Sequence, residues 1–205
     1  MSPLISILTA TYNRSTLLSR AWKSIEKQTF QNWEWIVIDD GSDDNTFDTL
    51  KPALKTKKVR YFWHHNQKQP LSLNVGLKLA LGKYVSILDS DDEYLPQHLQ
   101  KRLEIIENQP YIDILEGGME IIGNPFVPDK NNIDTQIHLD ECVAGGTFFG
   151  KTEVFKALNG FQNLAYASDA DFLERASHQQ YQIFKVKEKT YRYYRDTPDS
   201  ICNNL

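Results

Sequence analysis

The chain has 205 residues, of which 40% are hydrophobic and 12% aromatic, and its formal net charge is −4. This length and composition suit one generous globular domain with a sizeable core. The acidic balance gives the surface as a whole no electrostatic attraction for nucleic acid, so we exclude nucleic acid as a partner.

The cysteines and the amino-terminal segment bear on the compartment. Cys142 and Cys202 fit no metal-ligand spacing, and two lone thiols are typical of a reducing compartment. The start, MSPLISILTATYNR, has no charged leader before its short apolar run and therefore does not predict a signal peptide. No segment approaches the ~20 apolar residues that span a bilayer. We expect a cytoplasmic protein.

Two hydrophobic periodicities alternate along the first half of the chain. Short apolar runs rich in β-branched residues predict strands, and apolar residues at helical spacing predict helices. The predicted strands are 4–10, 33–39, 59–64 and 83–89, and the predicted helices are 14–28, one that ends near Lys55, 71–81 and one that Pro96 opens. Asn13 or Ser15 is placed to cap the first helix. This alternation predicts an α/β fold with a mostly parallel sheet covered on both faces.

The pattern is looser after Asn108. Residues 111–122 predict a strand, and 123–132 predict a loop rich in Gly, Pro and Asn. A turn-rich stretch leads to a predicted helix over 169–178, and 182–188 predict a last strand. Because we find no repeat, linker or low-complexity tract, we predict a single domain over residues 1–205.

Polar side chains follow three of the predicted strands. The first strand ends in TATYN (9–13), the second in DDGS (39–42) and the fourth in DSDD (89–92). In wound α/β sheets, ligands bind outside the carboxyl ends of the strands, and parallel strands bring these ends to one edge. The coincidence of three polar strand ends therefore predicts a ligand site there.

The acidic stretch after the fourth strand is typical of a cation site. Asp89 and Asp91 would face the same side if the strand continued, and no Lys or Arg adjoins them in the sequence. Paired oxygen ligands favour Mg²⁺ or Mn²⁺, which are often held by one or two carboxylates with phosphate oxygens completing the shell. The alternative is that Asp92 and Glu93 cap the helix opened by Pro96, but capping leaves Asp89 and Asp91 unexplained.

Four segments resemble, in order and spacing, the motifs of family 2 glycosyltransferases, whose fold is GT-A. They are ISILTATYNR, WIVIDDGSDDNT, LNVGLKLALGKYVSILDSDDEYLP and YASDADFLERA. The match is close over 4–107 and looser over 145–200. The resemblance implies a cation-requiring, inverting transferase that uses a nucleotide sugar, most simply a UDP-sugar. Residues 1–108 would form the donor half, and 109–205 the half with the acceptor and the catalytic base.

The resemblance also implies roles for individual residues. Thr9, Tyr12 and Asp40 match positions that hold the nucleotide base and ribose, and the less favoured alternative for Tyr12 is an aromatic residue of a turn. Asp89 matches a carboxylate near the ribose or the metal. Asp91 matches the ligand of the Mn²⁺ or Mg²⁺ ion that bridges the diphosphate.

Asp169 matches the catalytic base, which would take the proton of the acceptor hydroxyl as it attacks the anomeric carbon. In the alternative, Asp169 or Asp171 merely begins a helix. The family often has a glutamate where this chain has Ser168. It also often has Arg-Asn where this chain has Leu73-Asn74, a departure that leaves the identity of the nucleotide base open.

Two further groups of residues each have two readings. Gly145, Gly146 and Thr147 stand where the acceptor is expected, and they could equally form a turn. Arg192 and Arg195 lie in YRYYRDTPDSI (191–201), a stretch that the family uses as a mobile flap near the diphosphate and that could equally be a solvated basic edge.

By analogy with the family, the acceptor is a growing polysaccharide or a lipid-linked saccharide in surface polysaccharide biosynthesis. That role implies peripheral association with the inner face of the membrane, and a homodimer would let so short a chain borrow acceptor surface from a second copy. Two rival functions stay open: a non-catalytic module that binds a nucleotide sugar, and a sugar nucleotidyltransferase. The second is disfavoured because TATYNRST lacks the glycine-rich loop that such enzymes carry after the first strand.

Overall fold

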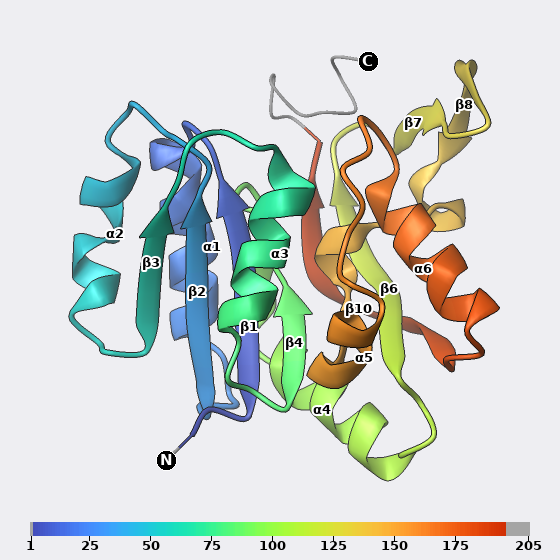
Figure 1. Ribbon diagram of the computed structural model, residues 1–205, viewed down its shortest axis with the longest axis horizontal. Helices are drawn as coiled ribbons and strands as arrows, with labels where there is room; N and C mark the ends of the chain where they lie inside the picture. The colour runs from blue at the N-terminus through green and yellow to red at the C-terminus, as the bar shows by residue number, and fades with distance from the viewer. Residues whose placement is uncertain (1, 196–205) are drawn as a thin grey trace.

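The computed structural model describes residues 2–195 of the chain, and Figure 1 shows its elements. The strands are β1 (Ile5–Thr11), β2 (Trp33–Asp39), β3 (Val59–Trp63), β4 (Tyr84–Ile87), β5 (Glu93–Tyr94), β6 (Ile114–Ile122), β7 (Phe126–Asp129), β8 (Asn132–His138), β9 (Phe149–Lys151) and β10 (Ile183–Tyr194). The helices are α1 (Ser15–Glu26), α2 (Thr46–Leu54), α3 (Gln69–Leu79), α4 (His98–Asn108), α5 (Thr152–Ala157) and α6 (Ser168–His178), and the short 3₁₀ helices are η1 (Leu139–Glu141) and η2 (Gly145–Thr147).

The main sheet is mostly parallel, which confirms the prediction. It has eight strands in the order β3-β2-β1-β4-β9-β6-β10-β5. β1 to β4 are parallel, and β6 and β10 keep the same direction because β9 pairs antiparallel with both β4 and β6. β5 pairs antiparallel with the end of β10. The carboxyl ends of β1 to β4, β6 and β10 therefore lie at one edge of the sheet.

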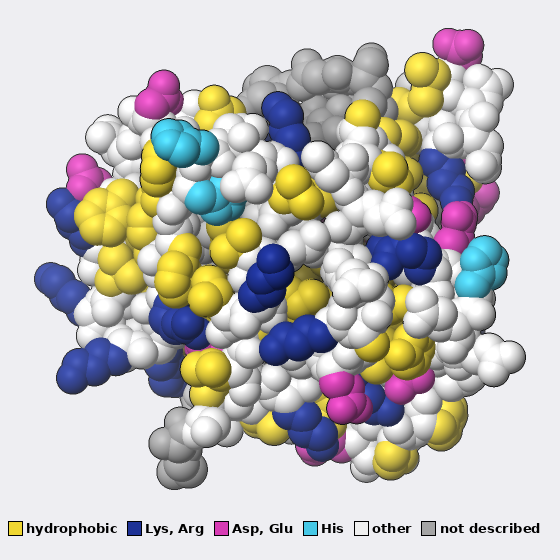
Figure 2. Space-filling model, in the orientation of Figure 1, with side chains coloured by type: hydrophobic (Ala, Val, Ile, Leu, Met, Phe, Trp, Pro, Cys, Tyr) yellow, Lys and Arg dark blue, Asp and Glu magenta, His cyan; other side chains and the backbone are white. Residues whose placement is uncertain are grey.

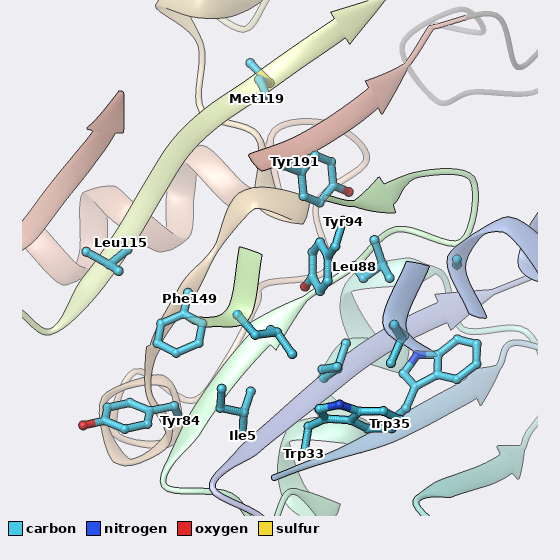
Figure 3. Close-up of a cluster of buried hydrophobic side chains, with 14 of the residues drawn as sticks. Ile5, Trp33, Trp35, Tyr84, Leu88, Tyr94, Leu115, Met119, Phe149 and Tyr191 are labelled. Carbon is cyan, nitrogen blue, oxygen red and sulfur yellow. The ribbon is translucent and has the colours of Figure 1, made fainter. Parts of the chain in front are cut away.

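Helices cover both faces of this sheet, as predicted. α1, α2 and α4 pack on the face that receives Ile5 and Ile7 of β1, and Figure 3 shows part of this core. α3, α5 and α6 pack on the other face, which receives Leu8 and Ala10 (Figure 1). Successive strand residues point to opposite faces, so a strand covered on both sides must be apolar almost throughout. No helix within residues 2–195 is long and apolar enough to cross a membrane.

The segment after β4 differs from the prediction. The strand ends at Ile87 rather than at residue 89, and the next helix begins at His98 rather than near Pro96. Asp92 is buried, and Glu93 lies in β5, where it pairs with β10. The reading in which these two carboxylates cap a helix is therefore wrong, because pairing with β10 holds the segment extended before the helix can start.

A hairpin replaces most of the loop predicted over residues 123–132. Residues 126–129 form β7, which pairs antiparallel with β8 in a sheet of its own. The turn residues Asp129 to Asn132 mark the tip of the hairpin rather than the middle of a loop. Its strands are short and mostly exposed, which weakens the alternation that a strand prediction needs.

The start of α1 is held by a neighbouring loop rather than by its own cap. Neither Asn13 nor Ser15 caps the helix, whose N-cap is Arg14 without a side-chain cap bond. Instead, Asp44 Oδ2 accepts the Ser15 N–H at 3.0 Å, and Asp44 Oδ1 accepts the Thr46 N–H at 2.9 Å. The carboxylate of Asp44 thereby joins the loops that follow β1 and β2, which frame the edge of the sheet.

We predict that Asp44→Ala lowers the free energy of unfolding by about 1 kcal/mol, because the first turn of α1 and the first turn of α2 each lose an acceptor. Urea denaturation followed by circular dichroism measures this. The matched control is Asp43→Ala, since Asp43 joins the same loops through its backbone N–H. Equal free energies for the two variants would contradict the assignment.

Candidate active site

A cleft of about 1350 Å³ lies at the carboxyl edge of the sheet. Its walls come from both halves of the chain: the loop after β1, the acidic turn after β4, the β7–β8 hairpin and the start of α6. Figure 2 shows acidic and basic side chains interspersed over the face that carries α3, α5 and α6, so no large field of one sign covers that face. The charges that matter for the site are those inside the cleft.

The acidic turn after β4 brings two carboxylates to the cleft. Asp89 and Asp91 both line it, and the Asp92 N–H closes the turn on the Asp89 carbonyl at 3.2 Å. The two carboxylates are together because of this turn rather than because of a continuing strand. Gln69 Nε2 donates to Asp89 Oδ1 at 2.8 Å, and Arg14 Nη1 lies 3.9 Å from Asp91 Oδ2.

The electrostatics of this turn favour a cation. The pKa of Asp89 is raised to about 7, mainly by burial and in addition by the negative charges of Asp91 and Asp169. Burial likewise raises the pKa of Asp169. A positive ion beside these carboxylates would relieve both the repulsion and the lack of solvation.

The same residues can be tested as a metal site. Within residues 2–195 no group of three or more His, Cys, Asp or Glu side chains could hold a metal ion. The chain therefore offers the pair Asp89 and Asp91, an oxygen-only set that matches Mg²⁺ or Mn²⁺ when phosphate oxygens complete the shell. The residues fit a cation that arrives with a diphosphate, and they do not fit a closed structural site.

Asp40 and Asp39 at the end of β2 organise the loops around the cleft. Asp40 lines the cleft, and its two carboxylate oxygens accept the backbone N–H groups of Gln67 at 2.8 Å and Lys68 at 2.9 Å. Asp39 Oδ1 accepts the Ser42 N–H at 2.8 Å and so supports the loop that follows β2. A nucleotide group would have to use the remaining lone pairs of Asp40.

The structure does not bring every predicted donor residue to the cleft. Tyr12 lines it and is 49% exposed, so its ring is available for stacking. Thr9 is fully buried, and its Oγ1 accepts the Trp35 Nε1–H at 2.9 Å. The pleat turns Thr9 toward the α1 face of the sheet, below the carboxyl edge. Thr11 points to the same face but is the last residue of β1, and it lines the cleft.

Asp169 lies in the first turn of α6 and also lines the cleft, a position that is compatible with both readings of this residue. Its Oδ2 accepts the Gly145 N–H and its Oδ1 accepts the Ala170 N–H, both at 2.9 Å. Ala167 precedes the helix with φ of 58°, a left-handed conformation that turns the chain into the cleft. Two backbone donors thus fix the direction of this carboxylate.

The residues predicted at the acceptor form the turn η2, and they divide between the cleft and the core. Gly145 and Gly146 line the cleft. A Cβ on Gly146 would lie 2.6 Å from Asp89 Oδ2, so a larger residue there would displace the Asp89 carboxylate. Thr147 is fully buried and accepts the Gly117 N–H at 2.9 Å, which makes its contacts structural.

The two arginines of the predicted flap lie behind the cleft rather than among its lining residues. Arg192 belongs to β10 and pairs with Glu93 and Glu120, each at 2.8 Å. Arg195 is 7% exposed, and its Nε donates to the Asn124 carbonyl at 3.4 Å. Residues 196–201 of the predicted flap lie outside the described residues.

Several cleft contacts have no signal in the sequence. Gln69 reaches Asp89 across 20 residues, and an Arg20 Nη2 donates to the Asp91 carbonyl across 71 residues. Asn74 donates to the Phe161 carbonyl at 2.7 Å and so fastens the loop that precedes α6. The motif spacing could have pointed to Arg14, which directly follows TATYN.

The β7–β8 hairpin is fastened to α6 and to the loop that precedes it. Tyr166 Oη donates to the Pro128 carbonyl at 2.6 Å, and Lys130 at the hairpin tip pairs with Glu174 of α6. Residues 127–131 of the hairpin and 163–168 of the loop before α6 both line the cleft. These two contacts therefore set how far the cleft is open near Asp169.

We predict that Tyr166→Phe loosens the hairpin, because the Pro128 carbonyl loses its donor. Hydrogen exchange of residues 126–138 should become about five-fold faster, which corresponds to the ~1 kcal/mol of one hydrogen bond. The control is Tyr111→Phe, whose hydroxyl bonds Gln109 on an exposed turn. Unchanged exchange in the hairpin of Tyr166→Phe would show that Lys130 and the strand pairing suffice.

The sheet order and the acidic turn at its carboxyl edge define a GT-A glycosyltransferase fold, and solved structures agree. TarS of S. aureus, crystallised with UDP-GlcNAc, matches with a TM-score of 0.80 at 22% identity over 96% of this chain and 60% of that chain. The mannosyltransferase PcManGT of Pyrobaculum calidifontis, in complex with GDP-Man and Mn²⁺, matches with a TM-score of 0.75 at 17% identity over 94% and 57%. These likenesses show the fold alone.

The family follows from the sequence itself. The family model for glycosyl transferase family 2 matches residues 6–152. The chain therefore belongs to glycosyltransferase family 2, which confirms the resemblance of the four segments. Asp169 lies outside the matched range, so its assignment as the base stays a prediction.

One relative is named for a specific activity. The GalNAc(5)-diNAcBac-PP-undecaprenol beta-1,3-glucosyltransferase of Campylobacter jejuni is 33% identical over 137 residues, which are 65% of this chain and 42% of the relative. The chain spans 18% or less of the length of three other relatives that it matches.

Proposed function

We propose that this chain transfers a sugar, with inversion, from a nucleotide sugar to a hydroxyl of a saccharide or lipid-linked saccharide. The donor is a UDP-sugar, and the reaction depends on Mn²⁺ or Mg²⁺. The observation that carries the proposal is the meeting of Asp89 and Asp91 with Asp169 in one cleft. These carboxylates come from different halves of the chain, and each has a separate task in such a reaction.

The donor side takes the nucleotide and the diphosphate. Tyr12 offers an aromatic face to the base, and Asp40 offers free lone pairs to a base or ribose donor. Asp89 and Asp91 would hold the cation, whose charge stabilises the departing nucleoside diphosphate. The Arg14 guanidinium beside Asp91 adds positive charge at the same place.

The acceptor side supplies the base. Each oxygen of Asp169 accepts one N–H, which leaves one lone pair on each for the proton of the acceptor hydroxyl. Burial raises the pKa of Asp169, which makes the carboxylate a better proton acceptor than one in water. The hydroxyl oxygen attacks the anomeric carbon as its proton moves to Asp169, and the bond to the diphosphate breaks on the opposite side.

The wider role rests on the relatives. The Campylobacter relative is named for a reaction on an undecaprenol-linked acceptor. This supports a lipid-linked saccharide as the acceptor of this chain, and a role in surface polysaccharide biosynthesis. Such an acceptor would bring the protein to the inner face of the membrane as a peripheral protein. A homodimer would extend the acceptor side, to which residues 2–195 contribute the β7–β8 hairpin, the η2 turn and the α6 region.

We predict cation-dependent binding of one nucleoside diphosphate. Calorimetric titration of UDP, GDP, dTDP and CDP, each with Mn²⁺ and again with EDTA, should give binding of UDP that EDTA weakens at least ten-fold. Asp91→Ala should weaken the Mn²⁺-dependent binding to the same extent, because it removes a carboxylate from the cation.

Glu26→Ala is the control for this titration, because Glu26 is exposed at the end of α1, away from the cleft. It should bind UDP as the wild type does. If the folded wild type binds none of the four nucleotides with Mn²⁺ present, the donor site is wrong.

We predict that Asp169→Asn lowers turnover by about 10²–10⁴-fold, because the acceptor hydroxyl loses its base. Donor binding should stay within a few-fold of the wild type, which calorimetry checks. Asp171→Asn is the matched control, since Asp171 lies in the same helical turn but pairs with Arg175 rather than lining the cleft.

The same experiment separates the enzyme from a binding module. A wild type that binds UDP but turns over with no saccharide or lipid-linked acceptor would favour the module. Equal turnover of Asp169→Asn and Asp171→Asn would contradict the assignment of the base.

A further inference from the structure

The end of β10 holds the acidic turn from behind. Across 102 residues of sequence, Tyr194 N–H donates to Asp92 Oδ1 at 2.8 Å, and β5 pairs with β10 through Tyr191 and Tyr94. Thr190 accepts the Leu95 N–H at 2.8 Å. The segment that follows the turn is therefore fastened to β10 over its whole length.

Tyr191 is the residue of β10 that reaches the turn itself. Its side chain is fully buried, and its Oη donates to Asp92 Oδ2 at 2.6 Å. The same Oη accepts the Asp89 N–H at 3.3 Å. Figure 3 shows the Tyr191 ring beside Tyr94, and the two ring centroids are 5.8 Å apart in an edge-to-face contact.

The Tyr191 hydroxyl forms a hydrogen bond at each end of the turn. A tyrosine hydroxyl has one donor and two acceptor sites, so it can bridge a backbone N–H and a carboxylate. The bridge joins residue 89 to residue 92 and leaves Asp91 between the two fixed points. The Tyr191 hydroxyl thereby holds both ends of the turn, although Tyr191 is not among the residues that line the cleft.

The surroundings leave the hydroxyl little freedom. A Cβ on Gly146 would lie only 2.3 Å from Tyr191 Oη, so the glycine of the acceptor-side turn lets the tyrosine approach. The ring of His98 packs against the same tyrosine, with centroids 6.2 Å apart. These two contacts therefore restrict the Tyr191 hydroxyl to its position between Asp89 and Asp92.

We propose that Tyr191 is a positioning residue, whose hydroxyl fixes the turn 89–92 so that Asp89 and Asp91 both face the cleft, where they would hold a diphosphate-bound cation. The inference rests on the proposed donor site. It adds a residue far along the chain that controls affinity for the cation and nucleotide together without touching either.

The test is Tyr191→Phe, which keeps the ring and removes only the bridge. Calorimetric titration of UDP with Mn²⁺ should show about ten-fold weaker binding, because Asp89 and Asp91 sample more orientations before they meet the cation. Titration with EDTA should stay within two-fold of the wild type, since the nucleotide contacts of Tyr12 and Asp40 are unchanged. Hydrogen exchange at the Asp89 amide should become faster.

Tyr194→Phe is the matched control. It also removes one hydroxyl from β10, here the bond of Tyr194 Oη to Glu93 at 3.0 Å, and it keeps the backbone bond to Asp92. Tyr194 also lines the cleft, but its ring stays in this variant, so the Mn²⁺-dependent affinity should stay within two-fold of the wild type. A role of Tyr191 in stability alone would lower the melting temperature and leave the affinity of the folded protein unchanged, which would overturn the inference.

The outcomes separate this inference from the proposed function. A wild type that binds no nucleotide with Mn²⁺ removes the donor site and the inference with it. A wild type that binds, with Tyr191→Phe within two-fold of it, overturns the inference alone. If Tyr191→Phe does not fold, Asp92→Asn replaces it, since an amide cannot accept both bonds that Asp92 accepts; wild-type affinity of that variant would likewise overturn the inference.

Discussion

The cleft depends on holding like charges together. Asp91 and Asp169 are close enough to raise the pKa of the buried Asp89, and repulsion of this kind grows as water is excluded. Such a cluster persists only where its backbone is fixed independently of the charges. Here neutral donors also hold the carboxylates themselves. The side-chain amide of Gln69 donates to Asp89, and the Gly145 N–H donates to Asp169. A cation would enter a site whose shape already exists.

The second half of the chain completes what the first half begins. β1 to β4 carry the acidic turn, and β9, β6 and β10 extend the same sheet, so residues of both halves contribute to its two cores. The cleft lies where the halves meet, because α6 and the β7–β8 hairpin stand opposite the turn. In the proposed reaction, the base would come from one half of the chain and the cation ligands from the other.

The sequence predicted much of this, and its misses have physical reasons. The strands buried on both faces and the carboxylates at their ends were readable because periodicity and strand polarity are local properties. Thr9 and Thr147 were placed at ligands by motif position alone, and the pleat and a buried turn direct both side chains into the core. The hairpin was missed because its exposed strands carry little alternation.

By itself the sequence determined the α/β order, the parallel edge and the acidic residues at it, because each follows from patterns within some ten residues. Only the tertiary structure decided how those residues are held. The bridge from Tyr191 to Asp89 and Asp92 and the bond from Arg20 to Asp91 join residues 71 to 102 positions apart. Such contacts depend on which strands become neighbours in the sheet, and local sequence patterns do not predict the order of the strands.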